Sequence, residues 1–162
     1  MIPTLLMFLG LTFTVVQQPA TNTLFVSPLP DVVTQHARVN TDCWNGYNSN
    51  IGLLAEERQT GQYVGYLKIG DEIVIDYGYG YEEIFIVSEV LRYRAASSGV
   101  LSNFVDEETG AVYTSLQLGN FIYCRHPRRL ILQTCLYDGY GRLIIEAMPV
   151  LPERNKKIIQ MK

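Results

Sequence analysis

Residues 130–135 read Leu-Ile-Leu-Gln-Thr-Cys, and residues 142–147 read Arg-Leu-Ile-Ile-Glu-Ala. Both are short apolar runs, and the residues between them are Tyr, Asp and Gly, together with one Leu, a composition that favours a turn. The pattern predicts a β-hairpin in which Cys135 closes one strand and Arg142 opens the next. Such a hairpin brings the thiol and the guanidinium together.

The same kind of pattern extends upstream. Apolar runs at 72–76 and 83–87 flank the segment Tyr-Gly-Tyr-Gly-Tyr at 77–81, which predicts a second hairpin. A further strand is expected at 90–93, and the polar stretch 97–110 is predicted to be a long surface loop. The chain is therefore expected to be mostly β.

The rest of the chain carries weaker signals. Residues 21–50 are rich in Pro, Asn, Thr and Asp, which predicts loop with short strands. Residues 53–58 favour either a short helix or the end of a strand. No internal repeat or long linker is evident, so we expect residues 21–162 to form one domain.

Composition limits the functional classes. The chain has 162 residues, of which 48% are hydrophobic and 18% charged, and this balance excludes a disordered or collagen-like protein. The formal charge of −3 argues against nucleic-acid binding.

Residues 2–16 form an apolar run that as a helix would span only about 22 Å, short of a bilayer core. We expect residues 1–20 to be an export signal or a weak membrane anchor, with a first buried strand as the alternative. An export signal would place the domain outside the cell or at its surface.

The Cys135 and Arg142 pair carries the main chemical hypothesis. A guanidinium raises the thiolate fraction of a nearby cysteine and donates hydrogen bonds to an oxyanion formed during acyl transfer. The alternative is a buried cysteine that happens to lie beside a surface arginine.

These segments resemble the sortase signature, in which a Leu-rich strand ends in Thr-Cys and the next strand begins with Arg. Residues 67–73, Leu-Lys-Ile-Gly-Asp-Glu-Ile, are similar to a strand entry of the same family. The resemblance covers roughly residues 50–150 and implies a closed β-barrel with short helices and long loops. It further implies a cysteine transpeptidase or peptidase that cleaves a peptide sorting signal of surface proteins. Cys135 would form a thioacyl enzyme, which an amine acceptor then resolves.

The family also uses a histidine, usually in a Gly-His pair. Aligned on that pattern, residues 53–58 place Glu57 where the histidine would stand. A carboxylate at this place cannot act as the same proton donor at neutral pH unless its pKa is strongly raised. His36 is the other candidate acid or base. His126 lies in a basic loop, which is expected to be solvated.

Several further assignments stay open at the level of sequence. Thr134, Tyr137 and Tyr140 are expected to touch substrate because they flank Cys135. Cys43 and Cys124 form a disulfide in an oxidising compartment, or stay as inert thiols.

The Tyr-rich segment 77–81 is expected to serve the hairpin turn rather than to line a peptide groove. No metal-ligand spacing or nucleotide loop is visible, so no cofactor is expected; an acidic run at 106–108 leaves calcium as an alternative.

Three functions are therefore compatible with the sequence. The first is a monomeric sortase-like transpeptidase with Cys135, Arg142 and His36. The second is an inactive module of the same fold that binds peptide or has a structural role. The third is a small secreted β-domain without an active site. The sequence leaves the sorting motif and the acceptor undefined.

Overall fold

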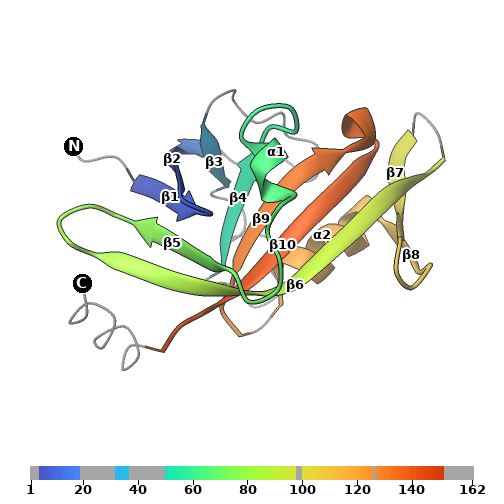
Figure 1. Ribbon diagram of the computed structural model, residues 1–162. Helices are drawn as coiled ribbons and strands as arrows, with labels where there is room; N and C mark the ends of the chain where they lie inside the picture. Colours follow the sequence, from blue (N-terminus) through green and yellow to red (C-terminus); the bar gives the residue numbers. More distant parts are fainter. Residues whose placement is uncertain (1–3, 19–31, 37–49, 98–99, 126, 152–162) are drawn as a thin grey trace.

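A computed structural model of the chain describes residues 4–18, 32–36, 50–97, 100–125 and 127–151. Within these residues lie ten strands and three short helices (Figure 1). In chain order they are β1 (Thr4–Phe8), β2 (Leu11–Gln18), β3 (Val33–His36), β4 (Ile51–Ala55), α1 (Gly61–Val64), β5 (Glu72–Asp76), β6 (Glu82–Ser97), β7 (Val100–Asp106), β8 (Val112–Thr114), α2 (Ser115–Tyr123), β9 (Leu130–Leu136), the 3₁₀ helix η2 (Tyr137–Gly139) and β10 (Gly141–Pro149).

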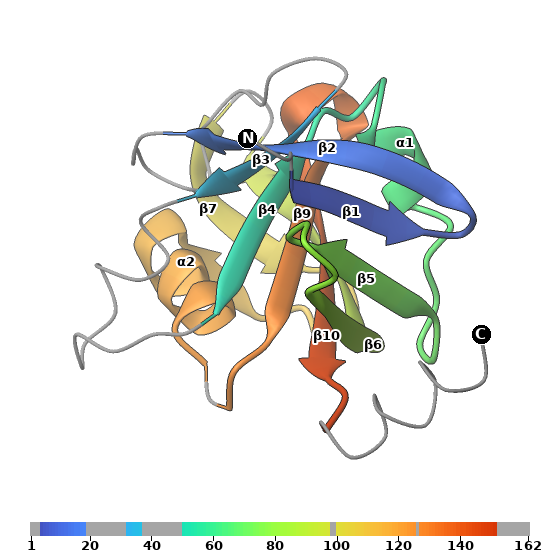
Figure 2. The same ribbon diagram turned by 90° about the vertical axis from the view of Figure 1, so that its left-hand side faces the viewer.

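The strands close into a barrel. Their order around the sheet is β10-β9-β4-β3-β2-β1-β5-β6, and β6 pairs with β10 to complete the ring. The β2–β3 and β4–β9 pairs are parallel, and the other pairs in the ring are antiparallel. β7 and β8 extend the sheet beyond β6, and α2 lies against the outside of the barrel (Figure 2). The predicted mostly-β, closed-barrel fold is confirmed.

Two apolar clusters stabilise the barrel, and alternate residues of β9 pack into one cluster or the other. Leu130 and Leu132 face the barrel interior, where they pack with Leu53 of β4. Ile131 faces outward, where it packs with Leu118 of α2 and with a smaller cluster on β7. This alternation follows from the two-residue period of a strand. β9 is therefore buried on both faces, which explains its nearly continuous apolar sequence.

Helix α2 begins with a capping box. The Thr114 hydroxyl accepts a hydrogen bond from the Gln117 backbone amide, and the Gln117 side chain accepts one from the Thr114 amide. These bonds satisfy two amides at the start of the helix. Its buried residues include Leu118 and Ile122, so the helix docks through one face.

Three sequence-based expectations change in the structure. The predicted loop over 97–110 is wrong for residues 100–106, which form β7, because Phe104 is fully buried against the outer cluster. The predicted strands 83–87 and 90–93 are parts of one continuous strand, β6. Within the proposed signal or anchor segment 1–20, residues 4–18 supply β1 and β2 of the ring, so the buried-strand alternative describes them.

None of the helices in the described ranges has the length and apolar character needed to cross a bilayer.

Candidate functional site

Cys135 and Arg142 are directly opposed on neighbouring strands. The pairing of β9 with β10 sets Arg142 against Cys135, as the hairpin pattern predicts. Directly opposed residues project to the same face of a sheet, so both side chains lie on the outer face of the barrel. The thiol is free and partly exposed, whereas Arg142 is buried.

The guanidinium of Arg142 is held by several contacts. Its Nη1 donates to the carbonyl oxygens of Gly139 (2.8 Å) and Gly141 (2.7 Å), both in the turn after β9. Its Cζ lies 5.5 Å from the centre of the Phe104 ring on β7, within range of a cation–π contact. The arginine therefore braces the turn beside the thiol in addition to supplying a positive charge there.

The end of β4 lies alongside Cys135 and carries two carboxylates. β4 runs parallel to β9 with Ala55 opposite Thr134, so Glu56 and Glu57 follow at the level of the thiol. Burial is the largest influence on the Cys135 thiol and raises its pKa above the ordinary value. Arg142 lowers the pKa, while Glu57 and Glu56 raise it, and the net shift is upward. The site therefore favours the protonated thiol, which is a weaker nucleophile than the thiolate.

A tight turn fixes the Glu56 carboxylate in place. The Glu56 carbonyl accepts hydrogen bonds from the amides of Gln59 (3.2 Å) and Gly61 (2.6 Å), and its carboxylate accepts one from the Arg58 amide (2.8 Å). A side chain at Gly61 would collide with the Thr134 hydroxyl and the Glu56 carbonyl. Glycine is thus required where this turn crosses β9.

Thr134 faces away from the thiol. Consecutive residues of a strand point to opposite faces, and the Thr134 hydroxyl is buried against Gly61, on the other face from Cys135. Its Oγ1 has no hydrogen-bond partner among the described residues. Thr134 is one of the residues predicted to touch substrate, but its side chain packs beneath α1, on the face opposite the thiol.

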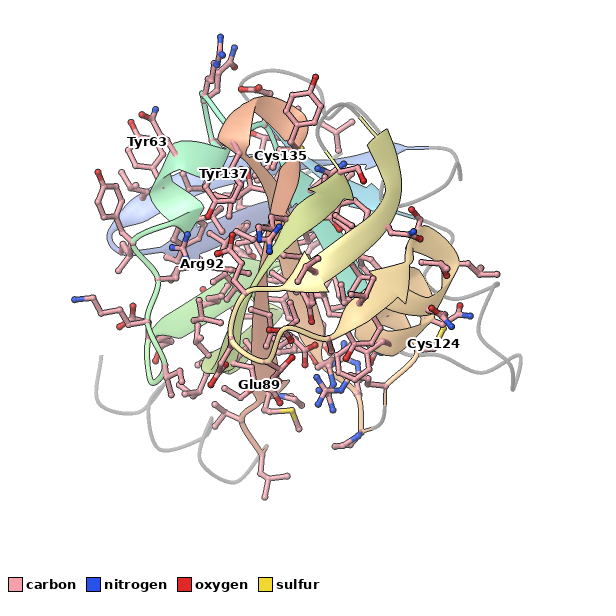
Figure 3. The ribbon with its side chains drawn as sticks, turned by 90° about the vertical axis from the view of Figure 1, so that its right-hand side faces the viewer. Tyr63, Glu89, Arg92, Cys124, Cys135 and Tyr137 are labelled. Atoms are coloured by element: carbon pink, nitrogen blue, oxygen red, sulfur yellow. The ribbon has the colours of Figure 1, made fainter. Side chains whose placement is uncertain are left out.

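Tyr137 and Tyr140 lie in the turn beyond Cys135, and both are about half exposed. Figure 3 shows Tyr137 and Cys135 at the same end of the barrel. Tyr137 has a positive φ of 56°, and its ring lies so close to Gly141 that a Cβ there would be 2.6 Å from Cδ2. Its hydroxyl donates to the Glu107 carboxylate at 2.8 Å, and this hydrogen bond is the main reason that the pKa of Tyr137 is raised. The turn thus presents two aromatic side chains beside the thiol.

The backbone of His36 lies away from this arrangement. β3 is antiparallel to β4, with Gln35 opposite Leu53, so the backbone of His36 lies toward Gly52, away from the Glu56 end of β4. Its side chain is not among those described. His126 lies outside the described residues.

Cys124 is disulfide-bonded, and Cys135 is free. Cys43, the partner that the sequence suggests for Cys124, lies outside the described residues.

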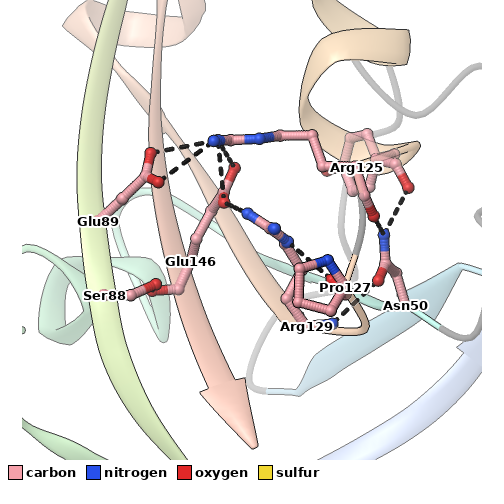
Figure 4. Close-up of polar contacts among 8 residues, drawn as sticks. Asn50, Ser88, Glu89, Arg125, Pro127, Arg129 and Glu146 are labelled. Atoms are coloured by element: carbon pink, nitrogen blue, oxygen red, sulfur yellow. Dashed lines mark hydrogen bonds and ion pairs between the residues drawn. The ribbon is translucent and has the colours of Figure 1, made fainter.

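An ion-pair network was not evident from the sequence. Glu146 on β10 is fully buried and binds two guanidinium groups, those of Arg125 (3.0 Å) and Arg129 (2.5 Å) (Figure 4). Arg125 also pairs with Glu89 on β6 at 3.1 Å, and Asn50 accepts a hydrogen bond from the Arg129 amide at 2.9 Å. The one available signal was a lone Glu within an otherwise apolar strand.

The basic loop is therefore largely paired within the chain rather than solvated. The third arginine of this loop, Arg128, pairs with Glu83 on β6, and its Cζ lies 5.5 Å from the centre of the Phe85 ring. The Glu83 carboxylate also accepts a hydrogen bond from the Tyr77 hydroxyl at 3.0 Å. These contacts tie the loop before β9 to the strand β6.

Comparison with known proteins yields matches only at the level of structure. No family model matches the sequence, and no curated protein matches it. Sortase E1 from Streptomyces coelicolor, solved with a tripeptide in its active site, is 16% identical with a TM-score of 0.56, covering 92% of this chain and 88% of that one. Sortase C1 of Streptococcus agalactiae is 13% identical with a TM-score of 0.55, covering 91% of this chain and 66% of that one.

Sortase A from Corynebacterium diphtheriae gives a TM-score of 0.56 at 11% identity, and there the match covers 92% of this chain but only 60% of that one. Identities this low carry information about the fold and not about activity. The closed barrel with its opposed cysteine and arginine therefore has the sortase fold, in a strongly divergent sequence.

Proposed function

We propose that this chain is a peptide-binding module of the sortase fold whose thiol site does not carry out thioacyl transfer. One observation carries the proposal: the strand end beside Cys135 bears Glu56 and Glu57. An imidazole at that place would stabilise a thiolate and donate a proton to a leaving amine. The two carboxylates instead favour the neutral thiol.

The same region retains features suited to an extended peptide. Tyr137 and Tyr140 present half-exposed rings at the turn beyond Cys135. Tyrosine gives a large contact area with few rotatable bonds to fix on binding, so such residues suit a peptide contact. Thr134 enters the proposal as a support for the turn that carries Glu56, through its contact with Gly61.

The second candidate is a cysteine transpeptidase, and the opposed Cys135 and Arg142 favour it. In that reaction the Cys135 sulfur attacks the scissile carbonyl carbon, and Arg142 donates hydrogen bonds to the oxyanion. The peptide C–N bond then breaks, and the leaving amine takes a proton from an acid, for which His36 is the candidate. An amine acceptor next attacks the thioester and releases the thiol.

We also propose a partner and a location for the protein. The ligand proposed is a peptide sorting signal of surface proteins or a segment like it, with an amine acceptor only in the catalytic alternative. The disulfide of Cys124 suits an oxidising compartment, which supports a location outside the cell or at its surface. A monomeric state completes the proposal.

Alkylation of Cys135 by iodoacetamide across pH 6 to 10, followed by intact mass spectrometry, tests the two candidates. The binding module predicts a half-maximal rate at a pH above about 8.5, the value for an ordinary thiol. Cys135→Ser supplies the control for labelling elsewhere. A half-maximum near or below neutral pH, shifted upward by His36→Ala, would overturn the proposal in favour of the transpeptidase.

A further inference from the structure

Two hairpin tips carry bulky apolar residues in the left-handed region of φ. Leu9 in the β1–β2 turn has a φ of 52°, and Tyr79 in the β5–β6 turn has a φ of 55°. This conformation costs free energy for residues of this size, and glycine avoids the cost. Tyr79 is 86% exposed and Leu9 is 47% exposed, so packing within the chain does little to offset it. The fold itself does not require these two side chains.

Hydrogen bonds and ring packing hold the tip that carries Tyr79. The Tyr77 amide donates to the Tyr81 carbonyl at 2.9 Å, and the Gly78 amide donates to the Asp76 carboxylate at 2.7 Å. The rings of Tyr77 and Tyr81 pack with their centres 5.3 Å apart. Tyr79 is thus held outward on a preorganised turn, which lowers the entropy lost when such a residue binds a partner.

A groove of about 520 Å³ lies over β1 and β5. Leu9 and Met7 line it together with Val74, and all three are apolar. Its acidic lining residues are Asp71, Glu72 and Glu82. Glu82 pairs with Asp76, next to the turn that carries Tyr79, so this end of the groove borders the tip. Leu9 lies at the other end, because the preceding residue Phe8 pairs with Ile73.

We infer that this hairpin face, made of the groove and the Tyr79 tip, binds a basic and apolar segment of another polypeptide. The apolar lining buries apolar side chains, and the carboxylates pair with lysine or arginine. Exposed tyrosine rings also attract such cations. Cys135 lies at the level of Tyr93 on β6, because Arg142 pairs with both residues. The Tyr79 tip precedes the other end of β6, about 35 Å away along the strand, so the inference is independent of the proposed function.

Fluorescence anisotropy with a labelled basic peptide tests the inference. The probe is Pro-Glu-Arg-Asn-Lys-Lys-Ile-Ile-Gln-Met-Lys, the sequence of residues 152–162, and its matched control has Gln at every Lys and Arg. We expect the full chain to bind the basic peptide at least tenfold more tightly than the control. Tyr79→Gly and the double variant Glu72→Lys/Glu82→Lys should each weaken binding at least tenfold, while Tyr79→Gly melts at the same or a higher temperature.

Tyr66→Ala is the matched control variant, because Tyr66 is an exposed tyrosine outside the hairpin face. It should bind the peptide as the unmodified chain does. Equal binding of the two peptides, no binding at about 1 mM, or binding unaffected by Tyr79→Gly would overturn the inference.

The alternative occupant of the hairpin face is the chain's own basic segment at residues 152–162. The full-chain variant Lys156→Glu/Lys157→Glu tests this alternative. A tenfold gain in peptide binding in this variant would assign the hairpin face to the chain's own basic segment and overturn the assignment to another polypeptide. Cys135 alkylation is measured on every variant. An unchanged pH profile shows that the thiol site is intact, so a loss of peptide binding then counts against the hairpin face and not against the proposed function.

Discussion

Substitution of Glu57 tests the electrostatics of the thiol site directly. Glu57 follows the end of β4 beside Cys135, and its charge raises the pKa of the thiol. Two unit charges about 6 Å apart in a medium of effective dielectric about 20 interact by about 3 kcal/mol, which corresponds to about two pKa units. Because both groups are partly exposed, solvent screening makes the downward shift of the Cys135 pKa in Glu57→Gln much smaller than this.

The direction follows from the charge. Removing a negative charge beside the thiolate stabilises it, so the alkylation profile of Glu57→Gln should move to lower pH. Glu57→His removes the same negative charge, and it should exceed Glu57→Gln in alkylation rate only below about pH 6.5, where the imidazole is protonated. Since nucleophilicity falls as the thiol pKa falls, the rate at pH 7.4 should rise about threefold rather than tenfold for Glu57→Gln.

The assay is iodoacetamide alkylation followed by intact mass spectrometry, at low salt and again in 0.5 M NaCl, where the shift should shrink. Glu72→Gln is the matched control, because this exposed carboxylate begins β5 and is not among the groups that influence the thiol. An unchanged or upward-shifted profile in Glu57→Gln would refute the argument that the β4 carboxylate suppresses the thiolate.

Four further predictions concern stability. Gly61→Ala should destabilise the fold by about 1 to 3 kcal/mol in urea denaturation, because the added methyl group collides with a buried hydroxyl and a backbone carbonyl. Gly65→Ala is the control, since the nearest atom there is 3.6 Å away, and an equal loss of stability in it would contradict this reason. Glu146→Ala should cost about 3 to 5 kcal/mol, since two guanidinium groups lose their buried partner; a loss below 1 kcal/mol would show that the network is not coupled to folding. Burial raises the pKa of Tyr123, so its contribution to stability is present below pH 10, the value in the unfolded chain, and lost as pH rises above it; Tyr123→Phe should flatten this alkaline decline in circular dichroism. Reduction of the Cys124 disulfide should cost about 2 to 4 kcal/mol, and an unchanged melting temperature in dithiothreitol would argue against that.

Local sequence was sufficient where neighbouring residues form the structure. The β9–β10 hairpin follows from two apolar runs around a turn, and it alone opposes Cys135 and Arg142. The β5–β6 hairpin follows from Tyr and Gly at 77–81 in the same way. Such patterns carry information because a hairpin pairs residues that are close in the chain.

Local sequence failed where burial depends on distant partners. β7 was predicted as loop because its flanks are polar, yet Phe104 gains its packing from α2 and from β6. The ion pairs of the buried Glu146 could not be predicted for the same reason, since its partners, Arg125 and Arg129, lie in a loop rather than on its own strand.

The mostly-β character of this protein and its cysteine–arginine pair can be predicted from the chain, because both arise from short-range strand and turn patterns. The surroundings of the thiol depend on contacts between distant segments. The parallel pairing of β4 with β9 brings Glu56 and Glu57 beside Cys135, although about 80 residues separate them in the chain. Parallel neighbours are joined by long crossovers, so their register depends on closure of the whole barrel, and no local pattern encodes it.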